Sequence, residues 1–99
     1  MPRPALEVHP EAVAEARAAR EWYAHRSQAA ANRFMAELDH AIEQILDSPS
    51  MWPAYVHDTR QYTLRRFPYL VVYRQMSNLV QIVAVANARR KPGYWQRRS

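Results

Sequence analysis

The first half of the chain repeats its apolar residues at the spacing of an α-helix. The repeating positions are Ala12, Ala16, Ala19 and Tyr23. Pro10 suits a first helical position, because its missing N–H would have no partner there anyway. The pattern predicts a helix from about Pro10 to His25, capped by His9. Its alanine-rich face allows a neighbouring helix to approach closely.

A second apolar stripe at helical spacing follows. It consists of Phe34, Leu38, Ala41, Ile42 and Ile45. Ser27 belongs to the residue types that cap helix N-termini. Pro49 ends the helix within a residue or two, because the residue before a proline avoids the α region. The short link at 26–28 predicts that the two helices form an antiparallel hairpin.

After the second helix the period of the apolar pattern changes from 3.6 residues to 2. Segment 48–59 contains two prolines and is predicted to be a loop. Strands are predicted at 5–9, 61–67, 69–75 and 79–87, with a turn at 75–78. The last is nearly all apolar and β-branched, as is typical of a central strand. This order predicts an α+β fold: an N-terminal strand and a helical hairpin packed on a mainly antiparallel sheet of three to four strands.

Length and composition fit one small cytoplasmic domain over residues 1–99. The chain has no cysteine, which excludes disulfides and thiol chemistry, and its single glycine excludes a glycine-rich phosphate loop. No apolar run approaches the ~18 residues of a membrane span, so no membrane partner is expected. The first ten residues lack the hydrophobic region of a signal peptide. A small chain without disulfide staples favours the cytoplasm.

The positive charge lies in the second half of this basic protein. Residues 1–50 hold five arginines against eight acids, whereas residues 51–99 hold nine basic residues against Asp58 alone. Eight of these nine are arginines, whose planar fork of donors matches phosphate and carboxylate groups. The asymmetry indicates a nucleic-acid or acidic-protein partner, with a solvated cationic face as the alternative.

The basic residues of this half are interleaved with aromatic ones. The candidate target- or nucleic-acid-binding residues are Arg65, Arg66, Arg74, Arg89, Arg90, Lys91, Tyr94, Trp95, Arg97 and Arg98. The cations that follow the last strand are expected to converge with those of the neighbouring strand, because a strand end is a rigid mount. Such a cluster could bind phosphate, or stabilise charge while a phosphodiester is attacked.

The end of the chain, 88–99, is expected to be a working basic and aromatic tail and not a solvated end. Tyr94 would act as a general acid or base only if the neighbouring cations lowered its pKa. Tyr94 or Trp95 could instead stack on a base, or pack the tail onto the sheet. Removal of everything after Asn87 is expected to abolish function and to leave the fold intact.

Other chemistry finds little support in the sequence. The four histidines (His9, His25, His40, His57) are not spaced to share a metal, so neither a metal nor a cofactor is expected. The serines lie at caps and turns, which argues against a hydrolytic triad. The helix acids are expected to be solvated or to face helix dipoles. Trp22 and Tyr23 are expected in the core, with a partner surface as the alternative.

Five segments in a fixed order resemble the RelE/ParE superfamily of type II toxins, close to its plasmid stabilisation branch. They are "HPEAVAEARAA", a helix with the pattern F…EL…AI…I before a proline, "RRFPYLVVYR", "VQIVAVAN" and "RRKPGYW". Together they cover about residues 5–98. The resemblance implies a helical hairpin against an antiparallel sheet. It also implies a toxin held inactive, in an oligomer, by a cognate antitoxin encoded beside it.

The superfamily contains two mechanisms, and the resemblance separates them by residue. RelE-like members cleave mRNA on the ribosome with a basic cluster, of which Arg65, Arg89 and Tyr94 would be the catalytic members here. Basic positions of that cluster are occupied in this chain by Thr63 and Leu70.

An incomplete cluster favours the ParE-like branch, which poisons DNA gyrase. Asn87 agrees, because many relatives carry histidine there. The alternatives are an mRNA endonuclease acting with the ribosome, and an inactive member that only binds its antitoxin. A disordered antitoxin segment, which folds as it binds, is expected in a groove along the helical hairpin and the sheet edge.

Overall fold

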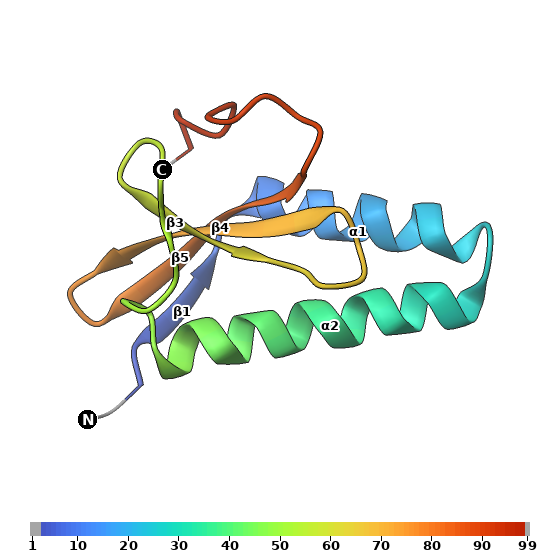
Figure 1. Ribbon diagram of the computed structural model, residues 1–99, viewed down its shortest axis with the longest axis horizontal. Coiled ribbons are helices and arrows are strands. Elements are labelled where there is room, and N and C mark those ends of the chain that lie inside the picture. Colours follow the sequence, from blue (N-terminus) through green and yellow to red (C-terminus); the bar gives the residue numbers. More distant parts are fainter. Residues whose placement is uncertain (1–2, 99) are drawn as a thin grey trace.

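The computed structural model describes residues 3–98; residues 1–2 and Ser99, the last residue of the predicted tail, lie outside the described residues. The elements are β1 (Ala5–Val8), α1 (Pro10–Ala24), α2 (Gln28–Asp47), β2 (Ala54–Tyr55), β3 (Thr59–Thr63), β4 (Tyr69–Met76) and β5 (Leu79–Asn87). The helical hairpin and the α+β class are confirmed (Figure 1).

Both helices begin at the predicted caps. The His9 side chain accepts a hydrogen bond from the Glu11 N–H at 3.1 Å, and the Ser27 hydroxyl accepts one from the Ala30 N–H at 3.2 Å. Each bond satisfies an N–H group that has no partner inside the helix. α2 ends two residues before Pro49, as expected for a residue type that cannot continue a helix.

The sheet has five strands in the order β1-β5-β4-β3-β2, with β1 parallel to β5 and every other pair antiparallel. The prediction of three to four strands was therefore too low. β2 lies in a segment predicted to be a loop, and it pairs with β3 across a turn where His57 and Asp58 adopt positive φ angles. A strand of two residues is too short to show an alternating pattern, so it could not be predicted from the sequence.

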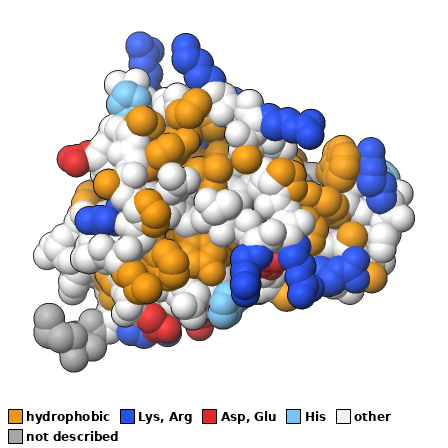
Figure 2. Space-filling model, viewed as in Figure 1, with side chains coloured by type: hydrophobic (Ala, Val, Ile, Leu, Met, Phe, Trp, Pro, Cys, Tyr) orange, Lys and Arg blue, Asp and Glu red, His pale blue; other side chains and the backbone are white. Residues whose placement is uncertain are grey.

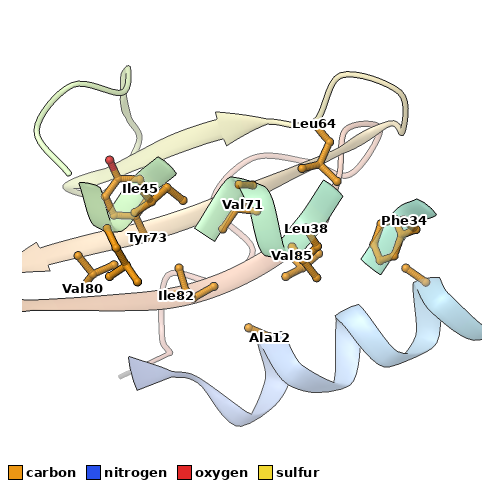
Figure 3. Packing of buried hydrophobic residues seen from close by; sticks show 13 residues of the cluster. Ala12, Phe34, Leu38, Ile45, Leu64, Val71, Tyr73, Val80, Ile82 and Val85 are labelled. Carbon is orange, nitrogen blue, oxygen red and sulfur yellow. The ribbon is translucent and has the colours of Figure 1, made fainter. Parts of the chain in front are cut away.

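The sheet separates two hydrophobic clusters. The helices cover one face, and the segment after β5 crosses the other (Figure 1). Figure 3 shows the larger cluster, in which Phe34, Leu38 and Ile45 of α2 face side chains of β4 and β5. The cluster on the opposite face consists of Leu70, Val72, Val83, Ala84, Ala86 and Trp95. A sheet covered on both faces explains why β5 is almost entirely apolar.

A β-bulge distributes the residues of β5 between these two faces. Val72 pairs with Ala84 and Tyr73 pairs with Ile82, so Val83 is an extra residue without a partner opposite. Ile82 belongs to the cluster under the helices, whereas Val83 and Ala84 both belong to the cluster under the tail. Strict alternation would have sent one of these two neighbours to the helix face.

The tail is part of the fold. Trp95 is only 1% exposed and stacks on the Tyr55 ring at 5.5 Å between centroids. It therefore packs the tail onto the sheet and is not accessible to a nucleic-acid base. The expectation that the fold would survive loss of the residues after Asn87 is therefore weakened, because that truncation would remove Trp95 and expose much of the second cluster to water.

Gly93 occupies a position of the tail that a larger residue could not fill. Its φ angle is +91°, and a Cβ atom there would lie 2.7 Å from Nε2 of His57. Only glycine adopts this backbone angle without strain. The turn at Gly93 thus directs the following residues back onto the sheet.

Trp95→Ala should destabilise the protein strongly. Loss of a fully buried indole should lower the free energy of unfolding by about 3–5 kcal/mol, from lost burial and the cavity left behind. Trp22→Ala is the matched control, because Trp22 is 50% exposed, and should cost about 1 kcal/mol or less. Denaturant unfolding of both variants measures the difference. Equal losses would show that the tail does not pack as described.

Candidate functional site

The carboxylate of Glu15, on α1, joins three parts of the chain. Oε1 accepts hydrogen bonds from the Val85 N–H and from Nη1 of Arg98, both at 2.9 Å. Oε2 accepts the Tyr94 hydroxyl at 2.5 Å and Nη2 of Arg98 at 3.1 Å. The Glu15 side chain is only 16% exposed. The prediction that the helix acids are solvated was therefore wrong for this residue.

Three of the predicted target-binding cations make contacts inside the chain. Arg90 pairs with the Glu15 carboxylate at 3.7 Å, although its side chain stays exposed. The guanidinium of Arg98 is 11% exposed, pairs with Glu15, and also donates to the Val83 carbonyl at 2.9 Å. Arg74 donates to the backbone carbonyl of Arg98 at 2.9 Å. Arg74 and Arg98 thus fasten the tail to the sheet.

Tyr94 does not meet the condition set for an acid–base catalyst. Burial, followed by the hydrogen bond and the negative charge of Glu15, raises the pKa of Tyr94, although Arg90 and Arg98 act in the opposite direction. The Arg90 guanidinium lies 3.6 Å from the centroid of the Tyr94 ring. The pKa is raised and not lowered, because a partly buried hydroxyl that donates to a carboxylate keeps its proton.

A groove of about 550 Å³ lies between α1 and the end of the sheet. We call it the aromatic groove. Its lining includes Trp22, Tyr23, Pro68, Tyr69, Tyr94, Arg89 and Arg90. Trp22 is half exposed, contrary to the core position expected for it, with the Arg26 guanidinium 3.5 Å from its ring centroid. Tyr23 packs against the core, as predicted.

The exposed cations of the tail stand beside this groove. Arg89, Arg90, Lys91 and Arg97 are exposed. A smaller hollow of about 380 Å³ continues the groove across Arg90 and Tyr94 toward Arg97. A ligand lying along both hollows would meet aromatic rings first and guanidinium groups afterwards.

A second depression, of about 530 Å³, lies over α2 and the β3–β4 loop. We call it the basic depression; its lining residues are Arg33, Ala36, Glu37, His40, Arg65 and Arg66. The Glu37 carboxylate accepts hydrogen bonds from the backbone N–H groups of Arg65 and Arg66. β3 ends at Thr63, so these two arginines sit on a loop held by a helix and not on a strand.

The expected convergence of the basic residues does not occur. Arg65 and Arg66 line the basic depression, whereas Arg89, Arg90 and Tyr94 line the aromatic groove. β4 lies between β3 and β5 in the sheet, and Glu37 holds the β3–β4 loop against α2 with two hydrogen bonds. Within residues 3–98, no group of three or more metal-ligating side chains comes together. In the same part of the chain, neither helix has the length and apolarity to cross a bilayer.

Comparison with known proteins decides the family. A family model described as the ParE toxin of the type II toxin–antitoxin system parDE matches residues 6–92. The chain belongs to this family. It is therefore the toxin component of a type II toxin–antitoxin system, and the resemblance found in the sequence is confirmed.

A solved structure supports the same ParE-like fold. A chain titled "Chromosomal ParDE TA system from P. aeruginosa" superposes with a TM-score of 0.62 at 19% identity. The match covers 86% of this chain and 96% of that chain. At this identity the likeness concerns the fold alone. No curated protein sequence matches significantly.

Several residues of the ParE-family chain that matter to its surfaces were missed in the sequence. They are Glu15, Arg33, Glu37 and His40. Glu15 did carry one signal, because it lies three residues after the buried Ala12 and four before the buried Ala19. A carboxylate on the inner face of a helix needs a partner, and an arginine-rich second half could supply one.

Glu15→Gln should loosen the tail of the ParE-family chain. The change leaves the poorly exposed guanidinium of Arg98 with only the exposed Glu11 carboxylate as a charged partner. The free energy of unfolding should fall by about 2–4 kcal/mol. Glu11→Gln is the control: Glu11 pairs with the same arginine at 3.4 Å but is 65% exposed. It should cost below about 1 kcal/mol. Denaturant unfolding compares the two, and similar losses would contradict a central role for Glu15.

Proposed function

We propose that this toxin stops growth by poisoning DNA gyrase, binding the enzyme and trapping it with its DNA cleaved. The family supports this proposal. The observation that carries the proposal is the hydrogen bond from the Tyr94 hydroxyl to Glu15. In the alternative ribonuclease mechanism Tyr94 would transfer the proton, and this bond already engages its hydroxyl. Plasmid stabilisation and a cytoplasmic location stay predictions.

The mRNA endonuclease needs Arg65, Arg89 and Tyr94 around one phosphodiester. A general acid or base must lie within hydrogen-bond reach of the proton that it transfers, and charge stabilisation needs donors at the reacting atoms. Arg65 lines a different depression from the other two residues. The loss of basic residues at Thr63 and Leu70 argues in the same direction. The separation weakens the nuclease alternative without any assumption about gyrase.

We place the gyrase contact on the exposed cations of the tail. Arg89, Arg90, Lys91 and Arg97 project from a segment that Trp95 and the Glu15 network hold against the sheet. A rigidly mounted set of cations loses little conformational entropy when it binds. The tail would therefore serve as both a structural layer and the binding surface.

The family implies an antitoxin partner, and we propose that one of its segments occupies the aromatic groove. An amphipathic segment with acidic residues fits that groove, because the exposed indole of Trp22 offers an apolar anchor and Arg89 and Arg90 offer opposite charge. Such a segment would cover part of the proposed gyrase contact. Neutralisation then follows from competition for the same arginines.

Expression of the chain without antitoxin should stop incorporation of labelled thymidine before that of labelled amino acids. With purified gyrase and plasmid, it should accumulate cleaved DNA. The double change Arg89→Ala/Arg90→Ala should weaken this effect about tenfold or more, the equivalent of about 1.4 kcal/mol. Arg17→Ala/Arg20→Ala removes the same charge from an exposed face of α1 and should have little effect.

Each opposite result points elsewhere. If amino-acid incorporation falls first, and Arg65→Ala or Arg89→Ala abolishes RNA cleavage, the chain is an mRNA endonuclease. If neither incorporation falls, it is an inactive member that only binds its antitoxin.

Trp22→Ala should weaken binding of the antitoxin encoded beside the toxin. An aromatic anchor at the centre of an interface contributes about 2 kcal/mol or more, so the dissociation constant should rise about 30-fold. Met51→Ala is the control, because Met51 is 69% exposed and does not line the groove. Titration calorimetry measures both. An unchanged affinity for the Trp22 variant would place the antitoxin elsewhere.

A further inference from the structure

The basic depression holds cations that the chain itself does not neutralise. Among the residues that the structure describes, ion pairs involve Arg3, Arg90 and Arg98 but not Arg33, Arg65 or Arg66. These three side chains are exposed around a hollow of about 530 Å³. Figure 2 shows Lys and Arg side chains gathered over α2 and the β3–β4 loop, at the lower right of that view.

Glu37 shapes this depression without cancelling its charge. Its carboxylate bonds to the backbone N–H groups of Arg65 and Arg66, and not to any guanidinium. The loop is thereby fixed against α2, while three formal positive charges surround one negative charge. Folding thus places cations from two distant segments, one in α2 and one after β3, around the same hollow.

The chemistry of the lining separates this hollow from the aromatic groove. Ala36 is its only apolar lining residue, so it offers no anchor of the kind that protein interfaces use at their centres. Exposed arginines without a large apolar side chain among the lining residues suit a ligand whose affinity comes from repeated negative charge. The guanidinium fork also matches the two free oxygens of a phosphodiester.

We propose that the basic depression binds the phosphate backbone of a nucleic acid, and that this surface is separate from the antitoxin groove. Arg33, Arg65 and Arg66 supply the phosphate contacts, and the His40 imidazole adds a further ring N–H donor. Because the two hollows share no lining residue, nucleic acid and antitoxin can occupy the toxin together. The inference does not depend on gyrase being the target.

The test measures binding of the full-length chain to fluorescent nucleic acids by anisotropy at several salt concentrations. The probes are a short duplex DNA, a single-stranded RNA of the same length, and a DNA analogue with a neutral backbone. The unaltered chain should bind the charged probes with affinity that falls steeply with salt, and should bind the neutral probe at least about tenfold more weakly. Preference for duplex or for RNA identifies the source of the phosphate.

Variants of the depression, and a control double variant that removes the same charge elsewhere, locate the contacts. Arg65→Gln/Arg66→Gln should reduce the slope of log affinity against log salt by about 2, one unit for each lost phosphate contact. Addition of Arg33→Gln to this double variant should reduce the slope by about 1 more. Arg17→Gln/Arg20→Gln removes two exposed arginines of α1 that lie outside the depression, and should leave the slope unchanged. Circular dichroism confirms that each variant is folded.

Three results would overturn the proposal. The first is equal binding of the neutral and charged probes by the unaltered chain, a result that needs no variant to fold. The second is an equal change in slope for the two double variants. The third is binding of a polyglutamate peptide without binding of either nucleic acid, which would assign the depression to an acidic protein.

Discussion

The carboxylate of Glu15 holds α1, β5 and the tail in one arrangement, and both faces of the sheet depend on it. Beyond the end of β1, the edge of β5 has no neighbouring strand, and Glu15 and Arg98 bond to its Val85 N–H and Val83 carbonyl instead. The same ion pair brings the tail back across the sheet, where Trp95 closes the second hydrophobic cluster. The buried ion pair thus supplies hydrogen bonds that a longer β1 would otherwise make with β5.

This arrangement gives the tail two roles, one in packing and one at the surface. Its inner side, with Trp95 and Arg98, is committed to the sheet. Its outer side, with Arg89, Arg90 and Lys91, stays exposed. The bulge at Val83 makes the division possible, because it turns two successive β5 side chains toward the tail and widens the apolar surface on which Trp95 rests.

Two carboxylates on two helices also keep the basic surfaces apart. Glu15 anchors the cations that follow β5, and Glu37 anchors the loop that carries Arg65 and Arg66. One surface combines aromatic rings with arginines, and the other combines three arginines with Ala36, Glu37 and His40 and has no aromatic anchor. The first surface suits the proposed antitoxin segment, and the second suits the proposed nucleic-acid backbone, so the two proposed ligands do not compete for the same residues.

The sequence by itself determined the helical hairpin, its caps at His9 and Ser27, the long apolar strands and the toxin family, because these follow from periodicity and from residues close along the chain. Only the tertiary structure decided that Trp95 is core, that Tyr94 is bonded to a carboxylate, and that Arg65 is separated from Arg89. Glu15 and Arg98 are 83 residues apart. No local pattern records which acid will meet which arginine, so the chemistry of the candidate site was set by contacts that only folding creates.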